Sequence, residues 1–326
     1  MNTLEKSKTI EKKARPFRSN ASLLFAAAKS LGYTVTEVIV NEQKNLSKFG
    51  FYIEHKNKRC YISSKSYFPN VPRWQLALMD NKLITTAILE QSSFSSIKTI
   101  LFTNEQSISL TKLKSQILNQ PLPILIKPTS GSDGSGVTLC YTKKQTTDLI
   151  TSYYRNNESF LAQPFINKDE YRITVVDKKI VFIHLKRFPT VTGDGIKTIE
   201  ELVSGAKYKD TTVIEQECRK QKLTLKSILK KGKEFQTHIT KKSDPSFYIT
   251  ENFPVKIRDW VTKLCTELGI DSVGIDVFIK GKFEDPSQML IIELNSKPDL
   301  CYITQYYNDR QTPLNVAIKI LTSYFK

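Results

Sequence analysis

The chain has little of what membrane-spanning and secreted proteins require. Across its 326 residues, no apolar run approaches the roughly 18 positions that a spanning helix needs. The N-terminal stretch MNTLEKSKTIEKKARP is charged and has no apolar segment of the kind that directs secretion. We therefore expect a cytoplasmic protein that does not act on a membrane.

Cysteine and histidine are also scarce, which narrows the chemistry. The five cysteines are scattered without a CxxC pair, so the sequence predicts neither a disulfide framework nor a zinc site. The three histidines, His55, His184 and His238, have no evident Ser or Cys partner in the sequence. We expect structural or solvent-facing roles for them, and we find no convincing covalent nucleophile.

Positive charge, in contrast, is abundant. The net charge is +17, with Lys and Arg spread along the chain rather than gathered in one block. This distribution is typical of a solvated lysine-rich surface, so a specific nucleic-acid partner is not expected. With 40% apolar and 25% charged residues, the composition is that of an ordinary globular protein, and the length predicts two or three lobes.

A Gly- and Ser-rich loop follows a short apolar strand, Ile124–Ile126, that ends in Lys127 and Pro128. Glycine lets successive backbone N–H groups converge on an anion, and the lysine adds a point charge, so the stretch suits phosphate binding. It has neither the Gly-Lys-Ser/Thr end of a Walker A loop nor the glycine spacing of a dinucleotide fingerprint. A flexible surface hairpin is an equally weighted alternative for the loop taken alone.

The remaining pattern mixes helices with short strands and predicts the α+β class. Residues 160–166 are apolar and broken by Pro164, and we interpret them as a linker; residues 205–250 are lysine-rich and yield little beyond one helix. Apolar periodicity predicts these helices: Ala21–Ser30, Trp74–Glu90 (with a polar interruption at 80–82), Thr111–Leu118, Lys144–Tyr154, Thr211–Gln221 and Phe253–Leu268, with Thr198 capping another. It predicts these strands: Thr34–Val40, Gly50–Glu54, Arg59–Ser63, Glu170–Val176, Ile180–Arg187, Ser272–Ile279 and Leu290–Asn295.

We expect three units along the chain. The first, residues 1–75, holds a charged tail and a small α/β lobe that contributes to a substrate pocket or serves as scaffold. The second, 76–162, is a compact lobe that carries the Gly-rich loop as a lid, and the third, 163–326, completes the molecule.

Polar groups stand isolated on three otherwise apolar strands. Asp276 interrupts one strand, while Glu293 and Asn295 share a face of the next. If these two strands pair, two carboxylates and an amide oxygen converge, a set that suits Mg²⁺; the alternative is that each carboxylate pairs with Lys or Arg. On the strand from Glu170, alternation places Glu170 and Arg172 on one face, unless that strand is a sheet edge facing water.

Several short segments together resemble the ATP-grasp ligases, in particular the ATP-grasp part of bifunctional glutathione synthetases and of cyanophycin synthetase. The resemblance covers roughly residues 70–320, and its strength lies in the order and spacing of the segments. They are MDNKLITTAIL (79–89), LIKPTSGSDGSGV (125–137), EYRITVVDKKIVFIHLKR (170–187), GDGIKTIEELV (193–203), GIDVFI (274–279) and IIELNSKP (291–298).

This resemblance implies an ATP-grasp fold in which two α+β lobes and an N-terminal α/β lobe clamp ATP. It assigns Asp276, Glu293 and Asn295 to one or two Mg²⁺ ions, with Mn²⁺ as an alternative. It implies that Arg172 and Arg187 lie near the transferring phosphate. The ATP-binding residues that it implies are Lys82 and Lys127 at the phosphates, Ser132, Gly134 and Gly136 in the lid, Gln163 and Phe165 in the adenine hinge, and Glu170 at the ribose.

The chain also departs from the family pattern. Gln163 stands where the hinge usually carries an acidic residue. Residues 230–253 replace the Asn-rich Ser-Thr-Gly-Gly loop of glutathione-type enzymes. The separate ligase domains that accompany the module in both relatives are not seen in this sequence.

The activity implied is ADP-forming ligation of a carboxylate and an amine, on an amino acid or peptide, through an acyl phosphate. A homodimer is compatible with this activity. Two alternatives stay open: a ligase that modifies a peptide or protein chain, and a non-catalytic nucleotide-binding protein.

Overall fold

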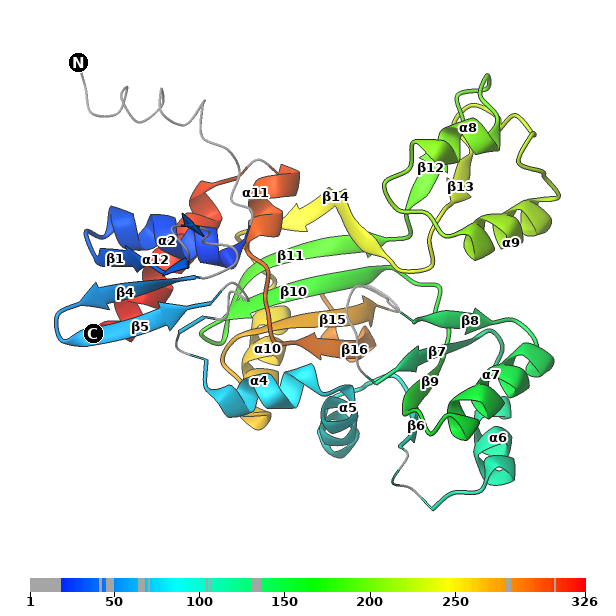
Figure 1. Cartoon of the computed structure of the whole chain (residues 1–326), viewed down its shortest axis with the longest axis horizontal. Coiled ribbons are helices and arrows are strands. Elements are labelled where there is room, and N and C mark those ends of the chain that lie inside the picture. Colours follow the sequence, from blue (N-terminus) through cyan, green and yellow to red (C-terminus); the bar gives the residue numbers. More distant parts are fainter. Residues whose placement is uncertain are drawn as a thin grey trace.

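A five-stranded antiparallel sheet forms the centre of the molecule (Figure 1). The computed structural model describes residues 19–40, 43–44, 50–63, 68–69, 71–103, 105, 107–129, 136–279, 283–307 and 309–326. The strands of the central sheet, in spatial order, are β14 (Lys242–Ile249), β11 (Lys179–Arg187), β10 (Glu170–Val176), β15 (Val273–Ile279) and β16 (Met289–Asn295). β10 is therefore an interior strand, and the alternative of an edge strand facing water is wrong.

The hairpin β10–β11 confirms the prediction for residues 170–187. Its two turn residues, Asp177 and Lys178, both have positive φ, 52° and 58°, as the type of two-residue turn that matches strand twist requires. Behind the sheet, α10 (Val255–Glu267) packs its apolar face, with Met79 and Leu89 completing the same core.

Met79 and Leu89 come from two helices where the sequence predicted one. α4 (Arg73–Asp80) and α5 (Lys82–Gln91) are separated by Asn81, whose extended backbone breaks the helix. The Asn81 Oδ1 accepts hydrogen bonds from the N–H groups of Leu83 and Ile84, as an N-cap does. The break places Lys82 at the first position of α5.

A second sheet, in spatial order β6 (Ile100–Phe102), β9 (Phe160–Pro164), β7 (Ile124–Pro128) and β8 (Thr138–Cys140), packs on α6 (Leu110–Leu118) and α7 (Lys143–Arg155). The predicted linker at 160–166 is thus wrong, because most of it is β9, between β6 and β7. Phe160, Leu161 and Ala162 are fully buried, which explains their apolar run. Pro164 stands at the strand end, where a missing N–H is tolerated.

The N-terminal unit combines segments from both ends of the chain. Its sheet is β1 (Thr34–Glu37), β4 (Phe51–His55) and β5 (Lys58–Ile62), beside a two-stranded ribbon β2 (Ile39–Val40) and β3 (Gln43–Lys44). α2 (Asn20–Ser30) packs against α12 (Gln311–Tyr324), which follows α11 (Cys301–Tyr307), so one core joins Leu24 and Phe51 to Leu321. The three-part division at residues 75 and 162 stays a prediction.

A small unit projects from the ends of β11 and β14 (Figure 1). It consists of the pair β12 (Thr190–Thr192) and β13 (Glu234–Gln236) with α8 (Ile199–Ser204) and α9 (Thr211–Gln221), around its own core of residues such as Leu229 and Phe235. Thr198 and Glu201 cap α8 reciprocally, as predicted for Thr198. A short 3₁₀ turn, Pro286–Gln288, leads into β16. Within the described ranges no helix has both the length and the apolarity to span a membrane.

Candidate active site

A cavity of about 930 Å³ opens between the central sheet and the second sheet. The predicted site residues that line it are Lys82, Lys127, Gln163, Phe165, Glu170, Arg172, Asp276, Glu293 and Asn295. Ser132 and Gly134 lie outside the described residues. Gly136, with φ 73°, stands next to the lining residue Val137, and a Cβ there would lie 2.9 Å from Pro128 Cγ, so its backbone excludes other residues.

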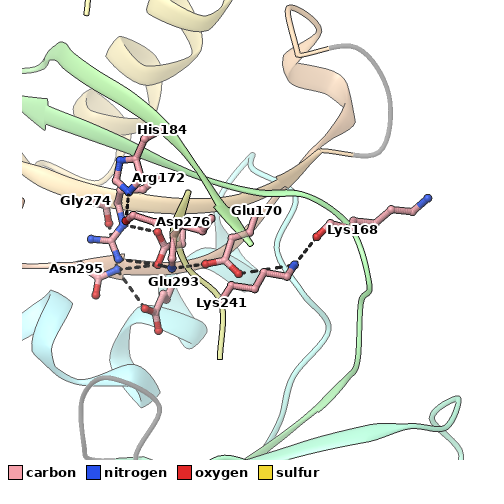
Figure 2. Close-up of polar contacts among 11 residues, drawn as sticks. Lys168, Glu170, Arg172, His184, Lys241, Gly274, Asp276, Glu293 and Asn295 are labelled. Carbon is pink, nitrogen blue, oxygen red and sulfur yellow. Dashed lines mark hydrogen bonds and ion pairs between the residues drawn. The ribbon is translucent and has the colours of Figure 1, made fainter. Parts of the chain in front are cut away.

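The predicted metal ligands converge as the strand pattern required. β15 and β16 pair in antiparallel register with Asp276 opposite Glu293. The Asn295 Nδ2 lies 3.2 Å from Glu293 Oε1 and 3.4 Å from Asp276 Oδ2. Figure 2 shows the three side chains gathered at one point. Their role as metal ligands stays a prediction, while their convergence is confirmed.

An alternating chain of charges runs beside them. Arg172 grips Asp276 with two donors, Nε on Oδ1 and Nη2 on Oδ2, the second at 2.8 Å. Lys186 Nζ donates to Asp276 Oδ2 at 3.1 Å and also to Glu170 Oε1. The Lys241 ammonium ends the chain, 4.0 Å from Glu170 Oε2. The order is therefore cation, anion, cation, anion, cation, which leaves each buried carboxylate neutralised.

These contacts set the protonation of the two buried acids. Burial would raise the pKa of Asp276, but Arg172 and Lys186 outweigh it and hold that pKa below its usual range. Burial raises the pKa of Glu170, with Lys186 opposing the rise. Lys241 has its pKa lowered to about 8 by burial, against the attraction of Glu170.

Gly274 leaves space for the Arg172 side chain, which belongs to this row of buried charges. A Cβ at this position would lie 2.8 Å from Arg172 Nη1. β10 and β15 place Arg172 opposite Asp276 in register, so the guanidinium crosses the backbone at Gly274. Any side chain at residue 274 would displace Arg172.

Lys82 and Lys127 reach the cavity from different elements. Lys82 begins α5, and Lys127 lies near the end of β7. Burial lowers the pKa of the Lys127 ammonium, Glu293 opposes this, and Lys82 adds to it. Two ammonium groups that repel each other beside a carboxylate make a site that favours a polyanion.

The two residues predicted for the adenine hinge, Gln163 and Phe165, make contacts within the protein. Gln163 is buried and donates from Nε2 to Thr99 Oγ1 at 2.7 Å. The backbone N–H of Phe165 donates to the Pro123 carbonyl at 3.0 Å. Both residues still line the cavity, where the Phe165 ring stands 6.0 Å from that of Phe188 and forms an apolar end.

Arg187 is the described member of the predicted catalytic set that does not line the cavity. Its guanidinium lies 3.5 Å from Asp244 and lines a neighbouring cavity of about 330 Å³. Sequence reasoning missed Lys186 and Lys241, which do line the main cavity. For Lys186 the missed signal was strand alternation, because Glu170 stands opposite Lys186 in the β10–β11 hairpin. Lys241 precedes β14, so no strand pattern includes it.

His184 matches the structural role expected of the histidines. Its ring stacks on Phe182 and Tyr302, with centroids 4.9 Å and 5.5 Å away, and its Nε2 is 2.8 Å from Ser243 Oγ. Burial, together with Arg172 and Lys186, lowers the pKa of His184 to about 3. It is therefore neutral at physiological pH.

The donor chemistry fits a hard divalent metal. Asp276, Glu293 and Asn295 offer carboxylate and amide oxygens, the ligands that Mg²⁺ accepts together with nucleotide phosphates. Throughout the part of the chain that the structure describes, no group of three His, Cys, Asp or Glu gathers to hold a metal. A metal held by Asp276 and Glu293 would therefore also need the Asn295 amide oxygen or oxygens from a bound ligand.

Residues 79–219 match the model of the RimK-like ATP-grasp domain. A solved bifunctional glutathione synthetase from Pasteurella multocida superposes on 93% of this chain and 43% of its own, with a TM-score of 0.57 and 18% identity. The chain therefore has the ATP-grasp fold. The α+β class and the ATP-grasp fold predicted from the sequence are confirmed.

Two curated relatives of this ATP-grasp chain are both named glutathione biosynthesis bifunctional protein GshAB. The one from Streptococcus mutans is 27% identical over 278 residues, covering 76% of this chain and 35% of its own length. The one from Listeria welshimeri is 22% identical over 284 residues, covering 80% and 35%. The ATP-grasp chain thus spans about a third of these relatives.

Proposed function

We propose that this ATP-grasp protein is a ligase that joins a carboxylate to an amine, on an amino acid or peptide, with release of ADP and phosphate. The observation that carries the proposal is the convergence of Lys82, Lys127 and Arg172 on a cavity that also holds three hard oxygen donors. The family match and the named relatives support ligation as the activity.

The charge of the cavity suits magnesium-bound ATP. Its described lining has seven cationic and five anionic side chains, an excess of two positive charges. They are Lys82, Lys127, Arg172, Lys186, Lys241, Lys242 and Lys297 against Asp80, Glu170, Asp276, Glu293 and Asp299. ATP with one Mg²⁺ carries about two negative charges, so the ligand would balance the site.

The residues divide the work of phosphoryl transfer. Lys82 and Lys127 neutralise phosphate oxygens, and Arg172, fixed by Asp276, presents charge where the transferring group and the acyl phosphate form. Asp276, Glu293 and Asn295 would hold Mg²⁺ or Mn²⁺, which supplies further neutralisation of the phosphates. With the carboxylate activated as a mixed anhydride, the amine attacks and the amide forms.

Trapping the anhydride tests the proposal. With a panel of amino acids and peptides, ATP and Mg²⁺, hydroxylamine should replace the amine and give a hydroxamate and ADP in equal amounts. Release of AMP and pyrophosphate would mean activation by adenylation and would overturn the mechanism. ATP binding without ADP release for any acid would favour the non-catalytic alternative, and a product found only on peptides would favour peptide or protein modification.

A further inference from the structure

Lys186 occupies the middle of the buried charge chain and spans three strands of the central sheet. It lies on β11 opposite Glu170 of β10, and it reaches Asp276 on β15. Its side chain is 16% exposed, while those of Asp276 and Glu170 are 1% and 12% exposed. All three charges depend on one another, because water hardly reaches them.

The Asp276 Oδ2 atom already has more donors than lone pairs. It accepts from Arg172 Nη2 at 2.8 Å, Lys186 Nζ at 3.1 Å and Asn295 Nδ2 at 3.4 Å, whereas a carboxylate oxygen offers two lone pairs. A metal ion that bound Asp276 there would have to replace a donor. In this structure the Asp276 Oδ2 atom is therefore already occupied by hydrogen-bond donors from the protein.

Of the three donors, Lys186 is the one that can leave. Arg172 holds Asp276 with two parallel hydrogen bonds, the stronger arrangement. Asn295 is itself one of the three predicted metal ligands, and its side chain can turn so that the amide oxygen faces a metal. Lys186 makes a single contact with Asp276 and keeps its contact with Glu170, so its ammonium has a second carboxylate to stay with.

We propose that Lys186 is the internal counter-ion that a divalent metal replaces at Asp276. The inference rests on the proposed function, since the metal is the one that accompanies ATP. Without metal, Lys186 neutralises the carboxylate and weakens the binding of a bare cation. With nucleotide, the same ammonium adds attraction for phosphate, so metal and nucleotide are favoured together over metal alone.

The two ligands should therefore respond to Lys186→Met in opposite directions. Removing one ammonium a few ångströms away should tighten the binding of Mn²⁺ alone by on the order of tenfold or more, and weaken metal-free ATP by about tenfold. Mn²⁺ binding is followed by the electron paramagnetic resonance of the free ion, and ATP binding by calorimetry in EDTA. The matched control is Lys179→Met, which removes an exposed lysine from the far end of β11.

The proposal would be overturned if Mn²⁺ alone bound Lys186→Met no more tightly than the Lys179→Met control. A pure phosphate ligand would lose ATP affinity with Mn²⁺ affinity unchanged, and a purely structural lysine would change both affinities in the same direction or neither. Should Lys186→Met not fold, the double variant Glu170→Gln with Lys186→Met removes a buried anion together with the cation. That protein should still bind Mn²⁺ alone more tightly than wild type, and an unchanged or weaker affinity would count against the idea. These readouts need no turnover, so a failed hydroxamate assay would refute the ligase activity and leave this result standing.

Discussion

The Glu293 carboxylate should contribute little to stability, because the contact seen for it is the 3.2 Å hydrogen bond from Asn295. Glu293→Gln should therefore abolish ADP formation and change the free energy of unfolding by no more than about 1 kcal/mol. Turnover at limiting Mg²⁺ and urea unfolding measure the two effects. Wild-type turnover in this variant would remove Glu293 from the metal site.

Asp276 should contribute more to stability than Glu293, because its carboxylate pairs with both Arg172 and Lys186 in the buried row of charges. Its pKa is lowered in the folded protein, so the unfolded state binds the proton more readily. The stability that it contributes is present above its unfolded pKa, about 3.9, and is lost as pH falls toward the lower folded value. Asp276→Asn should cost about 3–5 kcal/mol near neutral pH and flatten this acid-side fall. Urea unfolding from pH 7 to pH 3 checks it, and parallel curves would contradict the assignment.

Lys82 and Lys127, the two lysines predicted to contact the ATP phosphates, can be tested by the ligands whose binding they affect. Lys82→Met and Lys127→Met each remove a cation from the cavity lining, so each should weaken ATP binding by about tenfold or more and leave adenosine binding nearly unaffected. Calorimetry with both ligands makes the comparison. Equal losses for ATP and adenosine would show that the lysines support the cavity wall instead.

Among the elements, α5 depends on its cap to aim Lys82. Asn81→Ala removes the acceptor of the Leu83 and Ile84 N–H groups and should cost about 1 kcal/mol of stability. It should also weaken ATP several-fold, because Lys82 begins the helix. Asn81→Ser keeps a capping oxygen and should stay near wild type in both measurements. If the two variants behave alike, the cap does not position Lys82.

Period-two alternation on long strands was the most informative sequence signal. It brought Asp276, Glu293 and Asn295 together from the sequence alone, and the same rule, applied across the β10–β11 hairpin, would have chosen Lys186 over Arg187. Alternation could not predict which strands pair with one another. Residues 160–166 were interpreted as a linker because an apolar run with a proline does not reveal that β9 pairs with β6 on one edge and with β7 on the other.

Long-range packing was equally hidden in the lysine-rich stretch and at the chain ends. α9 was predicted with the observed bounds, Thr211–Gln221, yet nothing local indicated that it closes a separate core with Phe235. The helix α12 was not predicted, and its partner α2 lies almost the whole chain away. Contacts at such separation follow from tertiary fit, which short windows of sequence do not contain.

For the whole molecule, we expect a substrate that differs from that of glutathione-forming enzymes. Between Phe235 and Tyr248 the chain forms β13 and most of β14, where glutathione-type enzymes are expected to carry an Asn-rich loop. Supplying γ-glutamylcysteine, glycine and ATP should give no glutathione by mass spectrometry. Formation at about 1 s⁻¹ or faster, an ordinary turnover, would show that the loop is dispensable.

The shared core of α2 and α12 also has a consequence for biosynthesis. Leu24 and Phe51 leave the ribosome early, whereas their partners Ala317 and Leu321 emerge hundreds of residues later. Until then the apolar surface of the N-terminal sheet stays exposed, and exposed apolar surface favours chaperone binding and aggregation. The second sheet with α6 and α7 draws its core from residues 100–162 and can form long before. We therefore expect the second sheet to fold before the core shared by α2 and α12 is complete.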